Sequence, residues 1–437
     1  MGYLSSNLKN EKMTKKIVII GCGFGGIALG KKLIDQPFDV LLLDKNNYHT
    51  FQPLLYQVAT GGLEADSIAY PIRRVFRGAK NVRFQMCEVL EIEPVQKILK
   101  TNVGNIDYDI LVVASGSCNK YFNFESIKYE FLPLKSVTDA LNMRSFLMQN
   151  LEQTVFTYNA DEKESLMNIA IIGGGATGIE LAGALAEMRR YVLPKDFPEI
   201  DFANMKITLF EAAPKLLGSM SAKASKASER FLKKLGVEIK LNAKVVSYEQ
   251  RKITLDDGHT FLADSVIWTA GVKGNAIDGL KLEYVNSENR FLVDEYNKVL
   301  NLDNVYAIGD VAAFTGTERS KGLPMLAPVA MQQATLLAKN LIAIENGKPL
   351  VPFVYKNKGV MATIGKNKAV VDLPSYSFQG VFAWFVWMFV HIISLVGYRN
   401  KLVTLLDWTG NYFNYDRPLG LIIRPYKKRD SVQSKSL

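Results

Sequence analysis

The stretch Lys16–Gly26, KIVIIGCGFGG, decides how the fold begins. It opens with a basic residue and four consecutive β-branched side chains, which predict a short buried strand. Gly21, Gly23 and Gly26 follow as a GxGxxG pattern. This pattern is typical of a strand that turns sharply into a helix, where bare backbone and unpaired helix N–H groups can meet a pyrophosphate. A purely structural turn is the alternative interpretation.

A second strand favours the binding interpretation. The apolar segment Val40–Leu43 ends in Asp44, eighteen residues after Gly26. An acid at the tip of the strand that follows a glycine loop can accept hydrogen bonds from a ribose hydroxyl. The opening therefore predicts a dinucleotide-binding unit.

The same pattern occurs again after Asn168. A strand, Ile169–Ile172, precedes a second GxGxxG, and a later strand, Lys206–Phe210, ends in Glu211. The two glycine loops start 152 residues apart and follow the same order of strand, loop, helix, strand and acid. We therefore expect two nucleotide sites. The glycines of the second loop are Gly173, Gly175 and Gly178.

Length and charge narrow the class of protein. The chain has 437 residues, which predicts two or three domains, and its net charge is +10. Basic residues gather near both ends, in Lys9–Lys16 and Arg424–Arg429, either as solvated tails or as contacts to an anionic membrane. Interleaved aromatic and basic runs of the kind that bind single-stranded nucleic acid are absent, so we expect no nucleic-acid partner.

The cysteines and histidines argue against two kinds of chemistry. The three cysteines, Cys22, Cys87 and Cys118, form no CxxC, which fits a reducing compartment and excludes a dithiol relay. The three histidines show no ligand spacing, so we predict no metal site.

Patterns along the rest of the chain predict an α/β fold. Strands with turns between them are expected from Val82 to Ala114, and helices over Ser136–Asn150, Ser221–Leu235 and Leu326–Ile344. The polar, acidic segment Asn159–Leu166 is expected to be a linker or surface turn. The strand Val305–Ile308 ends in Gly309-Asp310.

These motifs resemble those of the two-dinucleotide-binding-domain flavoproteins, and within them the type II NADH dehydrogenases, or NADH:quinone oxidoreductases. The resemblance runs from Lys16 to about Pro418. Its most specific parts are DKNNYHTFQPLLYQVATG, which begins at Asp44, and the C-terminal run that ends GYRNKL. Further parts are VVASGS at 112–117, GGGATGIE at 173–180, TAGV at 269–272, YAIGD at 306–310, PVAMQQA at 328–334 and GVMATIGKNKAV at 359–370.

The resemblance implies two Rossmann-like domains and a C-terminal membrane-docking region. The expected FAD-binding domain is discontinuous, with residues 1–122 and 288–345, and the NADH-binding domain, 123–287, is inserted in it. Residues 346–437 form the expected quinone and membrane-docking region.

The resemblance also assigns the first glycine loop to FAD and the second to NADH. Glu211 is followed by Ala212-Ala213 rather than by an arginine that could meet a 2′-phosphate, so we expect NADH rather than NADPH. The implied FAD contacts are Gly21, Gly23, Phe24, Gly25, Gly26, Asp44, Lys45, Ser115, Gly116, Asp310 and Gln333. The implied NADH contacts are Gly173, Gly175, Ala176, Thr177, Gly178, Glu180, Glu211 and Gly271.

Glu180 is the candidate catalytic residue. It lies two residues after Gly178, where a helix-start acid stabilised by the helix dipole is the simpler interpretation. The resemblance places this glutamate near the nicotinamide, where it would steer the ring or take part in proton delivery.

The electron acceptor is inferred from the C-terminus. Phe378–Tyr398 carries no charged residue over 21 positions and would span a bilayer as a single helix. A buried core helix, a transmembrane helix and a helix lying on the membrane surface are the alternatives. We favour the last, because the resembling family docks in this way and Arg399, Lys401 and the basic cluster could bind anionic headgroups.

One departure from the family concerns the quinone. The family has an Ala-Gln pair near the flavin, whereas this chain has Ala327-Pro328, and proline cannot hydrogen-bond a quinone carbonyl. Gln332, one turn later, is the candidate replacement, and the candidate tunnel wall is Leu395 and Val396.

The leading hypothesis is a non-proton-pumping NADH:quinone oxidoreductase, peripheral to the cytoplasmic face of the cell membrane. Its expected partners are NADH, a membrane quinone and the lipid surface, and the resemblance adds a possible homodimer. A soluble NADH-dependent reductase of the ferredoxin type and a redox-signalling flavoprotein are the alternatives. The missing dithiol argues against glutathione-reductase-like activity and against sulfide:quinone oxidoreductase.

Overall fold

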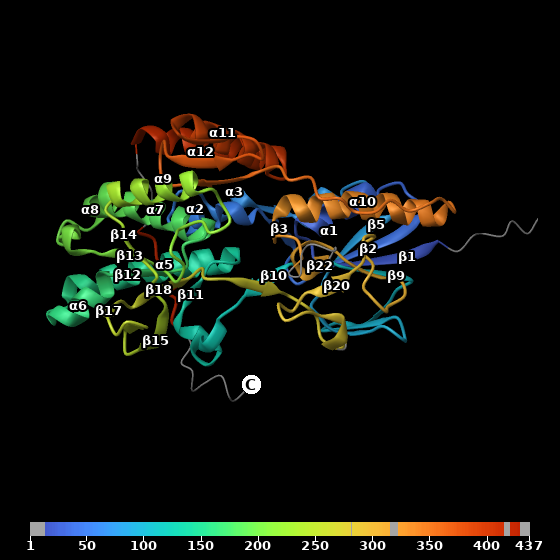
Figure 1. The fold of residues 1–437 in the computed structure, drawn as a ribbon, viewed down its shortest axis with the longest axis horizontal. Helices are drawn as coiled ribbons and strands as arrows, with labels where there is room; N and C mark the ends of the chain where they lie inside the picture. Colours follow the sequence, from blue (N-terminus) through green and yellow to red (C-terminus); the bar gives the residue numbers. More distant parts are fainter. Residues whose placement is uncertain (1–13, 281, 315–321, 415–419, 429–437) are drawn as a thin grey trace, which may run out of the picture. The chain divides into compact units, whose positions relative to one another are not determined.

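The structure, a computed structural model, describes residues 14–280, 282–314, 322–414 and 420–428 (Figure 1). The chain divides into two compact units. Unit 1 comprises Met1–His49, Pro71–Ser117 and Lys273–Tyr355, and unit 2 comprises Thr50–Tyr70, Cys118–Val272 and Lys356–Leu437. The chain passes between the units five times. Four of these passages fall at the short strands β3, β4, β10 and β19, with bounds Tyr48–Thr50, Ala69–Pro71, Ser117–Asn119 and Val272–Gly274, and the fifth follows Tyr355.

Unit 1 is built on a parallel sheet with strand order β21-β9-β1-β2-β5. Its strands are continuous apolar runs, as expected for a parallel sheet that is covered on both faces. The helices α1 and α10 pack on one face, together with side chains such as Ile17, Ile19 and Leu42. The bounds are β1 Lys15–Ile20, α1 Phe24–Lys32, β2 Phe38–Asp44, β5 Val82–Met86, β9 Ile110–Val113, β21 Val305–Ala307 and α10 Ala327–Glu345.

Smaller elements cover the other face of this sheet. Side chains such as Val18, Leu41 and Val113 pack there against Leu99 and Phe291. An antiparallel sheet β6-β7-β8 and the pair β20-β22 provide this layer. The bounds are β6 Val89–Glu93, β7 Ile98–Thr101, β8 Gly104–Asp107, β20 Phe291–Val293 and β22 Ala312–Phe314. The short helix α4, Ile72–Val75, packs on the first face, with α1 and α10.

Unit 2 repeats the parallel arrangement, with strand order β11-β18-β12-β13-β14. The three-stranded sheet β15-β16-β17 supplies one further layer, through side chains such as Ile253 that pack near Trp268. The bounds are β11 Leu132–Pro133, α5 Val137–Phe156, α6 Ala160–Met167, β12 Ile169–Ile172, α7 Ala176–Tyr191, α8 Leu193–Asp196, β13 Ile207–Glu211, α9 Ala222–Lys234, β14 Glu238–Leu241, β15 Val245–Glu249, β16 Lys252–Leu255, β17 Thr260–Leu262 and β18 Ser265–Trp268.

The C-terminal part of unit 2 is an antiparallel sheet β23-β24-β25 that leads into two helices, α11 and α12 (Figure 1). The sheet packs against α7 and α9, and α12 packs against α3. The bounds are α2 Leu55–Ala59, α3 Ala65–Ile68, β23 Val360–Thr363, β24 Ala369–Asp372, β25 Ser377–Gly380, α11 Val381–Ser394 and α12 Tyr398–Asn414.

Two sequence-based expectations about local structure are wrong. Asn159–Leu166 is not a linker: Asn159 caps α6 by accepting a hydrogen bond from the Glu162 N–H, and acids in the first turn suit the helix dipole. Phe378–Tyr398 is not one helix, because it begins in β25 and α11 ends at Ser394. Gly397, with φ +88°, allows the turn into α12. Within the described residues, no helix combines the length and apolar character needed to cross a membrane.

Candidate functional site

The first glycine loop in unit 1 connects β1 to α1 with its backbone exposed to a ligand. A Cβ on Gly26 would lie 1.8 Å from the Gly21 carbonyl oxygen, so only glycine allows this close turn. A Cβ on Gly23, the N-cap of α1, would meet nothing within 4 Å, and no side chain caps the helix there. The uncapped N–H groups and the open space suit an anion such as a pyrophosphate.

Asp44 at the end of β2 fixes this loop. Its Oδ2 accepts a hydrogen bond from the Cys22 N–H at 2.7 Å, and its Oδ1 accepts one from the Asn46 N–H at 2.8 Å. Burial raises the pKa of Asp44, and the two backbone N–H groups partly offset this. Each carboxylate oxygen keeps a further lone pair with which a ribose hydroxyl could be bound.

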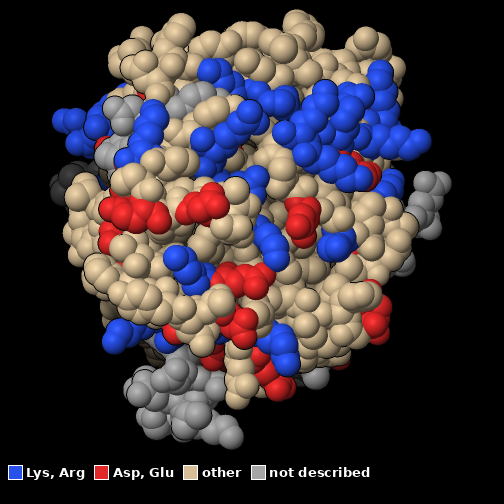
Figure 2. Space-filling view, turned by 90° about the vertical axis from the view of Figure 1, so that its left-hand side faces the viewer, with Lys and Arg blue, Asp and Glu red and all other residues tan. Residues whose placement is uncertain are grey.

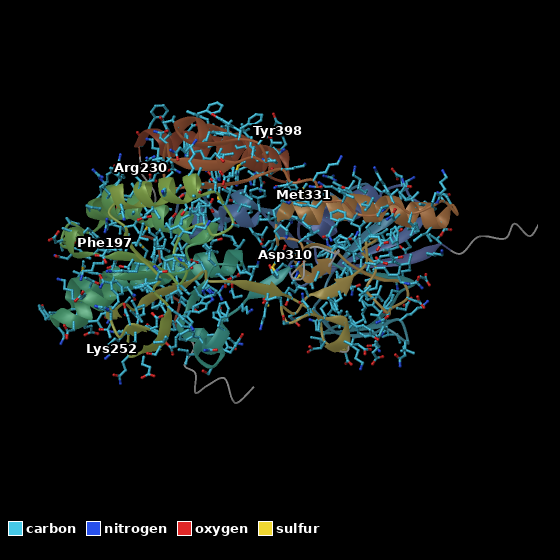
Figure 3. All side chains as sticks on the ribbon, viewed as in Figure 1. Phe197, Arg230, Lys252, Asp310, Met331 and Tyr398 are labelled. Atoms are coloured by element: carbon cyan, nitrogen blue, oxygen red, sulfur yellow. The ribbon has the colours of Figure 1, made fainter. Side chains whose placement is uncertain are left out.

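Asp310 is held in unit 1 by a residue that the sequence did not single out. The Ser117 hydroxyl donates to Asp310 Oδ2 at 2.6 Å (Asp310 is labelled in Figure 3). The neighbouring Gly309 N–H donates to Gln333 Oε1 at 2.8 Å, and Gln333 Nε2 donates to Asn297 Oδ1 at 2.9 Å. Gln333 is buried, so in this structure it fixes the Gly309-Asp310 turn. Its expected contact with FAD stays a prediction.

His49 is a second residue that the sequence reasoning missed. Its ring is buried, its Nδ1 lies 3.0 Å from the Cys22 carbonyl oxygen, and the Phe24 ring packs edge-on against it. Its Nε2 is buried without a hydrogen-bond partner among the described residues. Burial lowers its pKa, so the ring is neutral at pH 7. Through its contact with the Cys22 carbonyl oxygen, the ring packs against the glycine loop. The only sequence signal was its place five residues after the strand-end acid.

The second glycine loop, in unit 2, reproduces the geometry of the first. A Cβ on Gly178 would lie 2.0 Å from the Gly173 carbonyl oxygen. Glu211 Oε2 accepts a hydrogen bond from the Gly174 N–H at 2.6 Å, and Oε1 accepts one from the Ala213 N–H at 2.7 Å. Gly175 is the uncapped N-cap of α7, as Gly23 is for α1. The two loops are therefore equivalent in geometry, each with a bare glycine turn, an uncapped helix start and a strand-end acid.

Glu180 lies on the buried face of α7, with 8% of its surface exposed. Its Oε1 accepts a hydrogen bond from the Thr363 N–H at 3.3 Å. Burial raises its pKa to about 8, against smaller effects of Thr363 and the Trp387 indole that lower it. At neutral pH the side chain is thus mostly a neutral acid that can donate a proton.

Two aromatic side chains, Trp387 and His391, lie on one side of Glu180 within unit 2. His391 stacks on Trp387 with ring centroids 4.1 Å apart, and its Nδ1 lies 2.7 Å from the Trp387 carbonyl oxygen. Burial lowers the pKa of His391 to about 4, so it is neutral at pH 7. The Trp387 Nε1 has no partner of normal hydrogen-bond geometry among the described residues. It therefore lowers the pKa of Glu180 as a polar group nearby rather than through a well-formed hydrogen bond.

The remaining predicted residues take several environments. Leu395 is buried, Gln332 and Val396 are partly exposed, and Lys45 is exposed. Gln332 belongs to unit 1 and the other two candidate quinone residues to unit 2. Pro328 occupies the first turn of α10, as expected for proline. Of the other predicted contacts, Ser115 and Gly116 follow β9, Ala176 and Thr177 start α7, and Gly271 follows β18.

Two glycine loops, each closed by an acid at a strand end, define an oxidoreductase of the class that binds a flavin dinucleotide and a pyridine dinucleotide. The chain belongs to the pyridine nucleotide-disulphide oxidoreductase family, which it matches over residues 15–334, and within that family to the type II NADH:quinone oxidoreductases. Residues 357–414 match the NDH2 C-terminal domain.

Individual relatives support this assignment. The type II NADH:quinone oxidoreductase Ndh of Mycobacterium tuberculosis is 34% identical, with 92% of this chain and 89% of the relative covered. A type II NADH:quinone oxidoreductase of Staphylococcus aureus is 30% identical, with 82% and 89% covered. The fold matches that of NDH2 from Plasmodium falciparum, solved in complex with NADH, with a TM-score of 0.84 at 20% identity and with 93% and 99% covered.

The residues of unit 1 fit FAD. A bare glycine turn, an uncapped helix start and a buried strand-end acid are the donor set that a dinucleotide requires. When bound, FAD supplies the two-electron chemistry that joins NADH oxidation to reduction of an acceptor. Cys22 and Cys87 are buried and in no disulfide, so neither offers a dithiol relay beside the flavin.

Proposed function

We propose that this chain oxidises NADH and passes the electrons through FAD to a membrane quinone, without pumping protons, while docked on a lipid surface. The observation that carries the redox half of this proposal is the pair of equivalent glycine cradles, each held by one strand-end acid. Unit 1 would hold FAD through the first loop, Asp44 and Asp310. Unit 2 would hold NADH through the second loop and Glu211, with Glu180 near the nicotinamide.

The functional domains proposed from the sequence remain part of this proposal. Residues 1–122 and 288–345 would form the FAD domain, 123–287 the NADH domain, and 346–437 the docking region. The equivalence of the two loops gives the first two assignments their support, because each parallel sheet carries one complete cradle.

The docking proposal is supported by the outer face of α11. Phe382, Phe385 and Phe389 follow helical spacing and are 70%, 53% and 66% exposed. The opposite face of the helix buries Ala383 and Trp387. A soluble protein rarely exposes such a stripe, whereas a helix that lies in a membrane interface needs one.

In the helix α12, polar side chains face the protein interior and apolar side chains face outward, which is the opposite of the usual arrangement in a soluble protein. Its buried residues include Asn400 and Thr404, while Leu402 and Leu406 are 49% and 62% exposed. Asn400 Nδ2 donates hydrogen bonds to three backbone carbonyl oxygens at the end of α3, at 3.0, 3.1 and 3.0 Å. The apolar outward face of α12 is therefore continuous in character with that of α11, and Tyr398 at its start is 83% exposed (Figure 3).

Basic side chains lie next to this apolar layer in unit 2. Figure 2 shows Lys and Arg gathered below the uncharged top of the molecule that α11 and α12 form, with acidic side chains lower down. The helix α9 packs against β24 and β25, which lead into α11. Cations at this level suit anionic headgroups. The exposed basic residues of α9 are Lys223, Lys226, Arg230, Lys233 and Lys234.

We place the quinone near this docking region, where a lipophilic substrate can leave the bilayer without crossing water. Gln332 remains the proposed polar contact, and Leu395 and Val396 the proposed apolar wall. We also propose docking on the cytoplasmic face, which fits the reduced thiols of Cys22 and Cys87. A homodimer formed through the C-terminal region stays a prediction.

Stopped-flow measurements test the redox proposal. NADH should bleach the bound flavin, and a short-chain quinone should then restore its absorbance. If the quinone fails to reoxidise the NADH-reduced enzyme, a soluble reductase or a signalling flavoprotein becomes the better assignment.

Vesicle flotation tests the docking proposal. Replacing Phe382, Phe385 and Phe389 by serine should lower partition into vesicles at least about 100-fold, because each buried aromatic side chain contributes about 1.5–3 kcal/mol. NADH should still reduce the flavin at the wild-type rate. The matched control is Phe156→Ser with Tyr158→Ser, which removes two aromatics that are 76% and 99% exposed outside α11 and α12. Equal partition of both variants and wild type would overturn the docking surface.

A further inference from the structure

A second buried carboxylate, Glu187, lies on the same helix as Glu180. The two residues are seven positions apart on α7, which is nearly two full turns, so they share one face of the helix about 10 Å apart along its axis. Glu187 is 6% exposed. Burying a carboxyl group costs free energy, and neither the FAD cradle nor the NADH cradle uses Glu187.

The end of β23 and the turn that leads into β24 lie along the face of α7 that carries the two acids. The Thr363 N–H donates to Glu180, and the Lys366 N–H donates to Glu187 Oε1 at 2.6 Å. A Cβ on Gly183, midway between the two acids, would lie 3.0 Å from the Gly365 nitrogen. A Cβ on Gly365, which has φ +78°, would lie 2.5 Å from Glu187 Oε1. The two glycines thus let one turn contact both carboxyl groups.

A cavity of about 90 Å³ within unit 2 reaches Glu187 itself and two neighbours of Glu180, although Glu180 is not part of its wall. Glu187 and Lys366 line it, and so do Thr363 and Trp387, the two residues that act on Glu180. Its other polar walls include Gln57 and Asn411. The wall is partly aromatic, but these polar groups give a cavity of this volume hydrogen-bond partners for several water molecules.

The side-chain ammonium group of Lys366 lies at the wall of this cavity. The Lys366 Nζ donates to the Tyr412 carbonyl oxygen and lies 4.0 Å from the centroid of the Tyr412 ring. Its ammonium group is therefore held at the wall of the cavity by Tyr412.

The overall reaction requires the uptake of a proton. Oxidation of NADH by a quinone consumes one proton from solution, since NADH, a proton and the quinone give NAD⁺ and the quinol. A buried acid that gives up its proton in each turnover must be reprotonated through a path that water can reach.

We propose that Glu187 takes up this proton from solvent and passes it through the water of the cavity to Glu180. In this step an O–H bond of the Glu187 acid breaks, an O–H bond forms on the Glu180 carboxylate, and solvent then reprotonates Glu187. No electron moves in the transfer. Glu187 acts on the reaction only by returning a proton to Glu180, so it is a positioning residue rather than a catalytic residue. The inference deepens the proposed function and rests on it.

The test compares the two half-reactions in the FAD-loaded enzyme with Glu187→Gln, which keeps an acceptor for the Lys366 N–H. Hydride transfer from NADH needs no proton, so flavin reduction should keep its wild-type rate. Reoxidation by a short-chain quinone should slow at least about tenfold, and Glu187→Asp should recover most of that loss. The control is Glu229→Gln, an acid of α9 outside the cavity, which should change neither rate.

An infrared measurement gives a readout that does not depend on turnover. After transfer into D₂O, the carboxylic acid band that Glu180→Gln removes should shift more slowly in Glu187→Gln than in wild type. If wild type is reoxidised by quinone while Glu187→Gln matches it in both measurements, the proton path falls and the function stands. If quinone does not reoxidise wild type, the proposed function itself falls.

Discussion

At the scale of single residues, Asp44 and Glu211 perform the same task at the two glycine loops. Each carboxylate accepts one backbone N–H from its loop and one from the residue two positions further on. Glu211, whose side chain is one methylene longer than that of Asp44, therefore makes the same pair of hydrogen bonds at the second loop. The strand-end acid is thus both part of the loop and, with its remaining lone pairs, available to a ribose.

Glu180 leads to a prediction about stability and pH. Its pKa is raised to about 8 in the folded chain from an ordinary value of 4.5. The folded state therefore keeps a proton that the unfolded state loses, and the stabilisation is complete below the unfolded pKa and is lost as pH rises through about 8. Wild type should lose up to about 1.4 kcal/mol of unfolding free energy per pH unit in this window relative to Glu180→Gln.

Denaturant unfolding of both proteins across this pH range measures the difference. The variant should also retain bound FAD, because Glu180 belongs to unit 2 and the first glycine loop to unit 1. Parallel pH profiles for wild type and Glu180→Gln would contradict the buried, protonated state of Glu180.

At the scale of elements, α12 is positioned by polar contacts in addition to aromatic packing, in which the buried Trp408 lies against Trp387. Besides the three carbonyls that Asn400 meets, the Trp408 indole donates to Gln57 Oε1 at 2.7 Å, and Asn411 Nδ2 donates to the Gly62 carbonyl oxygen at 2.9 Å. Directional bonds on the inner side free the apolar side chains for the outer side. This is how a helix with many polar residues can present an apolar surface.

Replacing Asn400 by leucine should loosen α12 from α3. The change leaves three carbonyls without their side-chain donor, at a cost of roughly 1–3 kcal/mol for each group that water cannot reach. Limited proteolysis should cut the variant within α12 faster than wild type. The control, Asn414→Leu, alters an exposed residue of the same helix and should leave the cutting rate unchanged.

At the scale of the whole molecule, the net charge of +10 is unevenly placed. The exposed cations of α9 lie on a helix that packs against the sheet that leads to α11, and Figure 2 shows a band of basic side chains below an uncharged surface. An apolar face and a basic band next to it act through different forces, and only the second is screened by salt. Membrane binding should therefore have two separable parts.

Charge reversal at Lys226, Arg230 and Lys233 separates these parts. Each cation near an anionic surface is worth about 1 kcal/mol, so partition into anionic vesicles should fall at least about 100-fold at low salt. Partition into neutral vesicles should stay at the wild-type level, and high salt should reduce the difference between variant and wild type. Equal loss on neutral and anionic vesicles would instead indicate damage to the fold of unit 2.

Much of the fold was predictable because its signals are local. The runs of apolar residues at Ile17–Ile20 and Ile169–Ile172, the glycine spacings and the acids that follow them specify each cradle within about 40 residues. The path of Phe378–Tyr398 was not predictable in this way, since an uncharged run fits a strand and a helix alike. Tertiary contacts divide it: its first residues pair with β24 as β25, and the turn at Gly397 and the packing of α12 against α3 separate α11 from α12.

The sequence by itself determined two dinucleotide cradles and the family, because both depend on short-range spacing that any chain with these residues must follow. Only the tertiary structure decided which polar groups meet across long separations. Ser117 reaches Asp310, and Thr363 and Lys366 reach two carboxyl groups on α7. The physical reason is that burial and partner choice arise when distant segments pack together. The perturbed acid at position 180, and the outward apolar faces of α11 and α12, exist only in that packed state.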